Sequence, residues 1–484
     1  MVTPRNLLFL LSDNHARGYL GAYGHPDARM PNLDRLAVNG VRFDNAYSAS
    51  PLCCPARAAI ATGRYPHQTG IWDNAIVYEG QVASWMHRLR ETGHPVVSVG
   101  KLHFRESTPA NGFSEEILPM HILNGKGGVH MLLRGLDDEP PNRAQWDLYA
   151  SRSGLGEAPY QPFDRKITEA AVDWLRLSGA RAEQPWVLFV SYPSPHPPFS
   201  VPAEFYNLFD EARVTLPSAT AFDAAVDHPA IAHFRQNHGS DQTMNEAALR
   251  RVVTGYLGLL AHLDFEIGKV LTALSEAGLE EDTRVVYTSD HGEMCGHSGL
   301  FGKCCLYEGA IGVPLIMSGP DMPSGRVVKQ VTSHVDLFPT ILECTGVPLS
   351  AGDHDLPGIS LWPAIADADE DRVGFAEFHA AGSKSGMFML REGDWKLIYH
   401  VGMAPQLFDL KNDPDEMTDL GADHPKAMLL ETRLREICDP EAIDAKAKAD
   451  QRKWIDRWGG KTAILDEGSL IFTPPPGGTA ELEG

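Results

Sequence analysis

Hydrophobic positions along the chain occur in two patterns. One is the short continuous apolar run that is typical of buried strands, and the other is the spacing of three to four residues that is typical of helices. Short continuous apolar runs predict strands that are covered on both faces, and they lie at residues 6–11, 41–47, 95–100, 186–191, 284–289 and 313–318. Helical spacing follows several of them: one helix opens at Pro31 and stops at Gly40, and others cover 82–91, 167–177 and 246–277. This alternation predicts an α/β fold with a large, mostly parallel sheet sandwiched by helices.

The pattern changes near Gly374. Three short strand-like runs, 374–379, 386–391 and 395–400, precede a helix at 426–437. We therefore expect a catalytic α/β domain at 1–370 and a smaller C-terminal α+β subdomain with an antiparallel sheet at 371–472. The proline-rich start of the remaining tail, 473–484, is incompatible with regular structure. The tail is expected to be flexible or to reach a neighbouring subunit of a homo-oligomer.

Composition and charge exclude several classes of function and location for this protein. The 484 residues are 43% hydrophobic, enough for one large core with a smaller one beside it. The formal net charge of −22 argues against a nucleic acid or an anionic membrane as partner. No apolar run approaches the roughly 20 residues that span a bilayer, and the first run is too short for a signal peptide. These observations predict a cytoplasmic protein without membrane contact. An anionic substrate would need a small basic island that contains a metal.

Seven cysteines, four of them in two adjacent pairs, do not suggest a disulfide framework. One pair stands out, because Pro55 suits the first turn of a helix and so places Cys53 at the helix N-terminus, where amide groups favour an anion. Arg57, one turn later, adds a fixed positive charge. Spacing alone leaves a packed cysteine pair at a helix start as an equal alternative.

Polar residues close two of the predicted strands. Asp13 and Asn14 follow the first strand, and Asp290 and His291 follow the strand at 284–289. Each pair by itself is as typical of a turn or a helix cap. Together at one sheet edge, two carboxylates, an amide oxygen and an imidazole favour a site for a hard divalent cation.

Residues 50–63 resemble the consensus of the type I, formylglycine-dependent sulfatases of the alkaline phosphatase superfamily, in which Cys-x-Pro-x-Arg precedes a short apolar helix and Thr-Gly. The resemblance implies an alkaline phosphatase-like fold. It also implies that a formylglycine-generating maturation enzyme oxidises Cys53, and not Cys54, to formylglycine, whose hydrate is the nucleophile. One divalent metal ion, Ca²⁺ with Mn²⁺ or Mg²⁺ as alternatives, would be bound by Asp13, Asn14, Cys53, Asp290 and His291. The family often has an acid at the position of Asn14 and Asn at that of His291, which leaves the metal's identity open.

Further elements resemble the same family and occur in its order. Gly100-Lys101-Leu102-His103 is similar to a Gly-Lys-x-His element, in which the lysine binds sulfate and the histidine contacts the nucleophile. The turn at 195–198 resembles one whose histidine, here His196, faces the leaving-group oxygen. Lys303 is similar to the lysine that neutralises the sulfate, and Arg57 to the arginine that holds the hydrate. Residues 334–340 match another landmark of the family.

The resemblance predicts a sulfuric ester hydrolase that cleaves a small aryl or alkyl sulfate ester to an alcohol and inorganic sulfate. A phosphonate monoester or phosphodiester hydrolase with the same formylglycine and metal site is the alternative, ranked lower because such relatives lack the Gly-Lys-x-His element. A third possibility, a catalytically silent binding protein, requires Cys53 to remain a thiol.

Residues 72–74 together with 100–104 are most similar to choline sulfatases. Trp72, Asp73 and Asn74 are therefore candidate substrate-binding residues, since a carboxylate and a ring face attract a quaternary ammonium. A core aromatic and a helix cap explain Trp72 and Asp73 equally well. We therefore predict a small sulfate ester without specifying choline.

Overall fold

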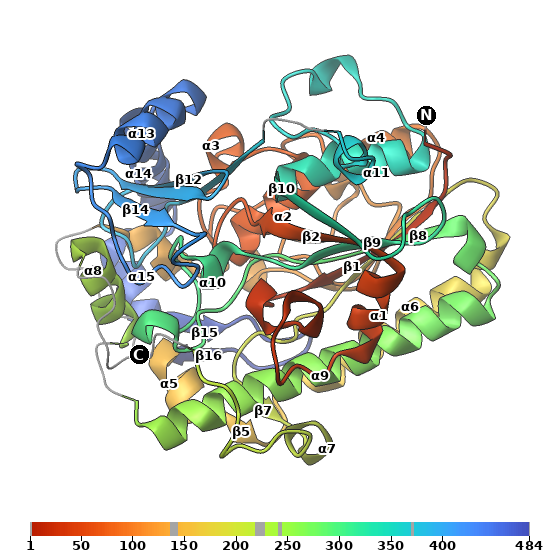
Figure 1. Cartoon of the computed structure of the whole chain (residues 1–484), viewed down its shortest axis with the longest axis horizontal. Coiled ribbons are helices and arrows are strands. Elements are labelled where there is room, and N and C mark those ends of the chain that lie inside the picture. The colour runs from red at the N-terminus through yellow and green to blue at the C-terminus, as the bar shows by residue number, and fades with distance from the viewer. Residues whose placement is uncertain (1, 136–143, 218–227, 241–243, 369–371, 484) are drawn as a thin grey trace.

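A computed structural model describes residues 2–135, 144–217, 228–240, 244–368 and 372–483. Its main feature is an eight-stranded sheet in the order β10-β2-β9-β8-β1-β6-β3-β4 (Figure 1). The strands are β1 (Asn6–Ser12), β2 (Gly40–Tyr47), β3 (Val96–Lys101), β4 (Glu115–Met120), β6 (Val187–Ser191), β8 (Thr283–Ser289), β9 (Leu315–Ser318) and β10 (Arg326–Ser333). All neighbours pair in parallel except β9, which runs antiparallel to β2 and β8.

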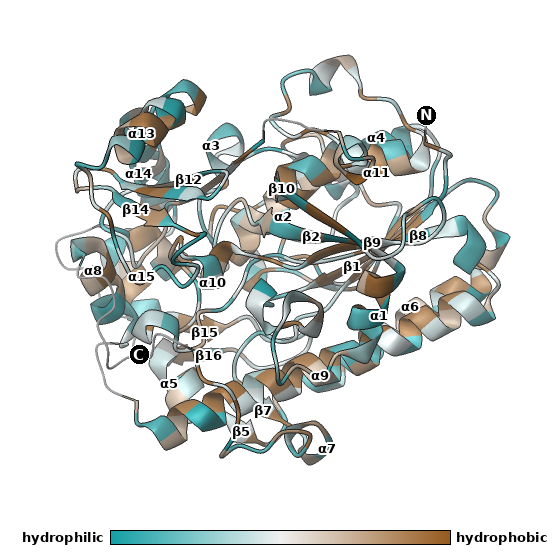
Figure 2. Cartoon of the chain, in the orientation of Figure 1, coloured by the Kyte–Doolittle hydropathy of each residue, from teal (hydrophilic) through white to brown (hydrophobic). Residues whose placement is uncertain are grey.

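Both faces of this sheet are covered, as the apolar strand runs predict. In β1, Leu8 and Leu10 pack into one core, whereas Leu7, Phe9 and Leu11 pack into the other. Helices α1 (Pro31–Asn39), α6 (Tyr160–Leu177) and α9 (Glu246–Glu276) cover the first face, and α2 (Cys53–Thr62), α4 (Trp85–Glu91) and α11 (Leu337–Thr345) cover the second. Figure 2 shows hydrophobic colour in the central strands and, alternating with hydrophilic colour, along helices α6 and α9. The predicted α/β sandwich is confirmed.

The helix expected at 82–91 begins three residues later, at Trp85. The side chain of Ser84 explains this start, because its Oγ accepts a hydrogen bond from the backbone N–H of His87. The helix expected from residue 167 begins earlier, at Tyr160, and this first turn becomes important for the site described below.

A second sheet lies C-terminal to the first. It is antiparallel throughout and consists of β11 (Val373–Phe378), β12 (Met387–Glu392), β13 (Trp395–His400) and β14 (Gln406–Asp409). Helix α13 (Pro425–Ile437) packs on it through Leu430 and Leu434, and α14 (Pro440–Arg457) follows. The predicted antiparallel sheet is confirmed, and the proposed boundary at residue 370 lies outside the described residues.

The C-terminal tail lies between two short strands and includes the second of them. Strands β15 (Ser469–Phe472) and β16 (Glu481–Glu483) form an antiparallel hairpin within the chain, and the proline-rich segment is the loop between them. Residues 473–480 between the two strands have no regular structure, and the flexible or intersubunit character expected for 473–484 stays a prediction. The prolines prevent strand pairing only where they stand, and the mostly apolar strand before them pairs with residues 481–483 after them. Among the described helices, none has the length and apolar character needed to cross a membrane.

Candidate active site

Four elements deliver the predicted site residues to one edge of the large sheet. Asp13 directly follows β1, Asp290 directly follows β8, and Lys101 ends β3. Cys53 is the first residue of α2 and is buried. Because β8, β1 and β3 belong to one parallel group, their carboxyl ends meet at the same edge, where α/β proteins bind ligands.

The predicted metal ligands lie together at this edge. One ligand atom from each of Asp13, Cys53, Asp290 and His291 lies within 4.8 Å of the others, and all four residues are buried. The ring of His291 is oriented by its Nδ1, which lies 3.0 Å from the carbonyl oxygen of Gly292 and donates to it. The lone pair of Nε2 therefore faces the cluster, and Nε2 lies 3.2 Å from Cys53 Sγ. This mixed set of oxygen, nitrogen and sulfur donors fits a divalent cation.

Asn14, the remaining predicted metal ligand, is oriented by Glu293, a residue that the sequence did not indicate. Its backbone has a φ of 78°, and its Nδ2 donates to Glu293 Oε2 at 2.6 Å. That bond turns Oδ1 toward the site, where Lys303 Nζ lies 3.4 Å away. The hydroxyl of Tyr149 donates to the same Glu293 oxygen at 3.2 Å. The position of Glu293 three residues after Asp290 is its one sequence signal.

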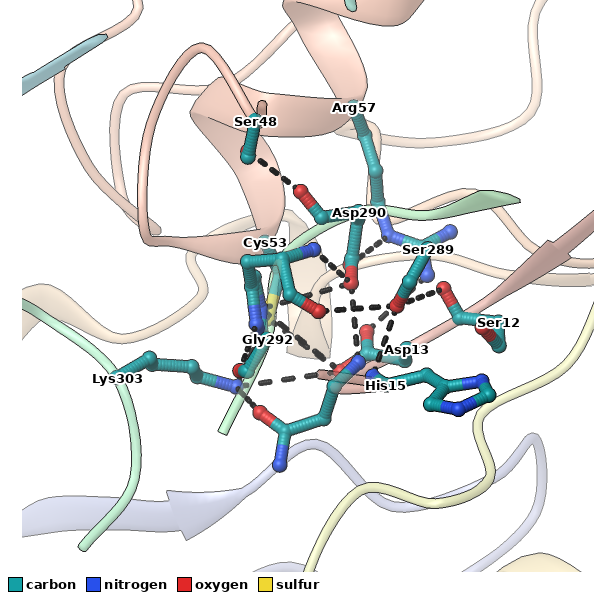
Figure 3. A network of polar contacts seen from close by, with 12 residues as sticks. Ser12, Asp13, His15, Ser48, Cys53, Arg57, Ser289, Asp290, Gly292 and Lys303 are labelled. Atoms are coloured by element: carbon teal, nitrogen blue, oxygen red, sulfur yellow. Dashed lines mark hydrogen bonds and ion pairs between the residues drawn. The ribbon is translucent and has the colours of Figure 1, made fainter. Parts of the chain in front are cut away.

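Arg57 forms ion pairs with both carboxylates of the donor cluster. Its Nε donates to Asp290 at 2.8 Å and its Nη2 to Asp13 at 3.1 Å (Figure 3). Its Nη1 donates to the carbonyl of Lys101 and to Ser191 Oγ. The guanidinium is almost completely buried. It therefore fixes the two acids of the cluster in one relative position.

Two lysines provide the basic island that the acidic chain requires. Lys101 Nζ lies 2.7 Å from Asp13 Oδ2, and Lys303 Nζ lies 3.3 Å from Cys53 Sγ. Burial by itself would raise the pKa of Asp13, but the charges of Lys101 and Lys303 hold it well below its usual range. Burial, together with the charge of Asp13, raises the pKa of Asp290 to about 6. The predicted concentration of cations around an anion site is present.

His103 and His196 line a cavity beside Cys53. Both ring nitrogens of His103 are buried without a hydrogen-bond partner among the described residues. Burial and then the charge of Lys101 lower the pKa of His103, so its imidazole is neutral and has a nitrogen free to accept a proton. His196 Nδ1 lies 2.8 Å from the carbonyl of Pro197, and burial with the charge of Lys303 lowers the pKa of His196.

Of the three candidate substrate-binding residues, one lines the cavity beside Cys53 and two do not. Asn74 lines the cavity, and its Oδ1 accepts from the backbone N–H of Cys54 at 3.1 Å. Trp72 is buried and donates to Asp450, whereas Asp73 accepts from two backbone N–H groups and from Gln451. Neither of these two lines the cavity. A core aromatic and a turn-capping carboxylate describe their surroundings.

A covered, mostly parallel sheet with a buried donor cluster and a helix-terminal cysteine at its carboxyl edge is the arrangement that the resemblance to hydrolases of the alkaline phosphatase superfamily predicts. The chain belongs to the sulfatase family and is a sulfatase: the family model described as Sulfatase matches residues 5–347. A second model, described as N-sulphoglucosamine sulphohydrolase, C-terminal, matches residues 296–439.

Known proteins resemble the chain over nearly its whole length. A choline-sulfatase from Rhizobium meliloti (strain 1021) is 30% identical over 94% of this chain and 91% of its own. Arylsulfatase K from Bos taurus is 28% identical over 94% and 85%. The solved phosphonate monoester hydrolase SpPMH from Silicibacter pomeroyi superposes with a TM-score of 0.71 at 25% identity, covering 90% of this chain and 94% of its own.

Proposed function

We propose that this sulfatase hydrolyses the sulfate ester of a small organic alcohol, with residue 53 as nucleophile after oxidation to formylglycine. The observation that carries the proposal is the position of Cys53. It begins a helix, its Sγ lies inside the donor cluster, and Lys303 Nζ lies 3.3 Å from that sulfur. An anionic oxygen at this position would be stabilised by the helix N-terminus and by the lysine.

Asp13, Asn14, Asp290, His291 and residue 53 would hold one divalent metal, with calcium the first candidate. When bound, the metal would lower the pKa of an oxygen on residue 53 and withdraw charge from sulfate. Arg57 keeps the two carboxylates in place for that purpose. Formylglycine would supply a hydrate with two hydroxyl groups, of which one attacks and the other later assists departure.

The remaining steps use side chains of the chain itself. One hydroxyl of residue 53 would first lose its proton to solvent. Its oxygen then forms a bond to sulfur while the bond from sulfur to the alcohol oxygen breaks, and Lys101 and Lys303 bind the sulfate oxygens. His196 or Lys303 donates a proton to that alcohol oxygen. His103 then accepts the proton of the second hydroxyl. The aldehyde C=O re-forms, and sulfate leaves with the electron pair of its bond to carbon.

A phosphonate monoester or phosphodiester hydrolase is the second candidate, favoured by the similarity to SpPMH. We would compare rates on an aryl sulfate, a phenyl phosphonate monoester and an aryl phosphodiester, using protein co-produced with a formylglycine-generating enzyme. Cys53→Ala is the blank. A sulfate rate far above the others, lost in the blank, supports the proposal, and a preference for either phosphorus ester overturns the substrate class.

Removal of the metal is expected to abolish turnover, because the carboxylates of Asp13 and Asp290 would then face the anionic substrate with only their ion pairs to Arg57 and Lys101 to offset them. Exhaustive dialysis against a chelator, checked by metal analysis, should reduce the rate by at least about a hundredfold. Titration with Ca²⁺, Mn²⁺ and Mg²⁺ should restore it and raise the melting temperature. Full activity in metal-free protein would contradict the proposed site.

Asp164 is expected to position His196 without touching the substrate. Its buried Oδ2 accepts a hydrogen bond from Ser194 Oγ at 2.5 Å, two residues before His196. Asp164→Ala should release this turn and impair protonation of the leaving alcohol, so we expect kcat to fall about tenfold more for phenyl sulfate than for 4-nitrophenyl sulfate.

The matched control is Glu169→Ala, which removes an exposed acid from the same helix. It should leave both rates unchanged. An equal loss on both esters in Asp164→Ala would show a general structural role and would remove His196 from the proton-transfer step.

A further inference from the structure

The C-terminal hairpin forms one wall of the active-site cavity. Residues 470–473, here called the hairpin wall, line the cavity that also contains Cys53 and Lys303. Leu470 and Phe472 alternate inward along β15 and are largely buried, as expected for one face of a strand. Residues more than four hundred positions apart in the sequence therefore enclose the same space.

A chain of ring contacts places this wall on the side of His196. The rings of His196 and Tyr160 pack edge to face with centroids 5.6 Å apart, and Tyr160 packs in the same way on Phe472 at 5.7 Å. The hydroxyl of Tyr160 donates to the carbonyl of Thr473 at 2.8 Å. Because His196 is the residue assigned to the leaving-group oxygen, the hairpin wall borders the alcohol half of the cavity. This step rests on the proposed function.

Aromatic rings from other elements extend the apolar lining of the cavity beyond the hairpin wall. Trp146 and Tyr149 of α5 (Ala144–Ala150) each contact Phe301, with ring centroids 5.5 and 5.4 Å apart, and all three line the cavity. The described lining residues include no Asp, Glu or Arg, and their one fully charged side chain is Lys303. A charged alcohol would lose its hydration here without an ion-pair partner, and a cationic one would also be repelled by Lys303.

We propose that the hairpin wall recognises an uncharged aromatic or branched apolar alcohol, with Phe472 as a specificity-determining residue. The ring of Phe472 gives an apolar group a flat partner. Trp146 and Phe301 provide further ring surface within the same cavity.

The hairpin depends on this packing for its position. A pair of short strands is marginal by itself, and the ion pair between Arg152 and Glu481 is partly exposed and contributes little. Arg152 also lies over the ring of Phe472, 5.7 Å from its centroid. The buried ring and the Tyr160 hydrogen bond are therefore the main attachments of the wall.

The test compares Phe472→Ala and Phe472→Leu with wild type on 4-nitrophenyl sulfate and methyl sulfate, using metal-loaded, formylglycine-containing protein. Phe472→Leu keeps an apolar side chain that holds the hairpin, so it separates loss of the ring from loss of the wall. For both variants we expect kcat/KM on the aryl ester to fall about tenfold through KM, with methyl sulfate changed less than about twofold. Leu482→Ala, on the outer side of the hairpin with Leu482 50% exposed, is the control and should change neither.

Calorimetric binding of phenylmethanesulfonate and methanesulfonate, neither of which can be hydrolysed, separates this inference from the proposed function. Weaker binding of the aromatic compound alone in the Phe472 variants supports the hairpin wall even if no sulfate ester is turned over, in which case the proposed function fails. Equal losses for both compounds and both esters would overturn the inference. A tenfold or greater preference of the wild type for choline sulfate over the aryl ester would also overturn it.

Discussion

Cys53→Ala is expected to abolish turnover of sulfate esters while leaving the melting temperature close to that of the wild type. Alanine suits the first turn of α2, and the substitution removes only a sulfur atom from a site whose acids remain paired with Arg57. Cys53→Ser should behave differently. A serine hydroxyl can attack sulfur, but it lacks the second hydroxyl whose electrons would expel sulfate, so the enzyme should stop after one turnover.

Mass spectrometry of Cys53→Ser after incubation with substrate should reveal a mass increase equal to one SO₃ on the peptide that contains residue 53. Cys54→Ala is the matched control, because Cys54 lies next in the chain and contacts Asn74 through its backbone N–H, which alanine retains. Burial raises the pKa of the Cys54 thiol well above its usual range, so no thiolate is lost with it. Wild-type activity in Cys53→Ala would refute the nucleophile.

The site was predictable from the sequence to the extent that its residues follow strands. Asp13, Asp290 and Lys101 stand at the carboxyl ends of β1, β8 and β3, and the parallel sheet required by the buried strand runs brings such ends together. For Cys53 the helix start alone left a packed cysteine as an equal alternative, and the resemblance of residues 50–63 to the sulfatase consensus selected it. The local pattern determines the element, and the fold class then determines where the element's end must lie.

Residues that support the site without following a strand directly gave no comparable signal. The carboxylate of Glu293 orients Asn14, and Tyr160 supports His196, but a buried acid or tyrosine has no period along the chain that marks its partner. The antiparallel direction of β9 was also hidden, because an apolar run is the same read in either direction. The pairing of β15 with β16 gave no signal either, because the prolines between the two strands mask it while preventing pairing only where they stand.

Arg57→Leu is the second substitution with a large expected effect, because it changes stability and catalysis together. The side chain is almost completely buried and makes four polar contacts, two of them to the carboxylates of Asp13 and Asp290. Without it, both acids remain buried and lose their shared cation. Breaking a buried ion pair in this way costs about 3–5 kcal/mol, so the melting temperature should fall clearly and activity should fall at least about a hundredfold.

The dependence of that loss on calcium distinguishes Arg57 from an ordinary buried ion pair. Since a bound divalent cation also compensates Asp13 and Asp290, calcium should raise the melting temperature of Arg57→Leu more than that of the wild type, measured against chelator-treated samples by calorimetry. Arg176→Leu, which breaks an exposed pair with Glu276, should show the calcium response of the wild type. If Arg57→Leu unfolded at a lower temperature without any larger response to calcium, Arg57 would stabilise the sheet edge but would not share its two carboxylates with the metal.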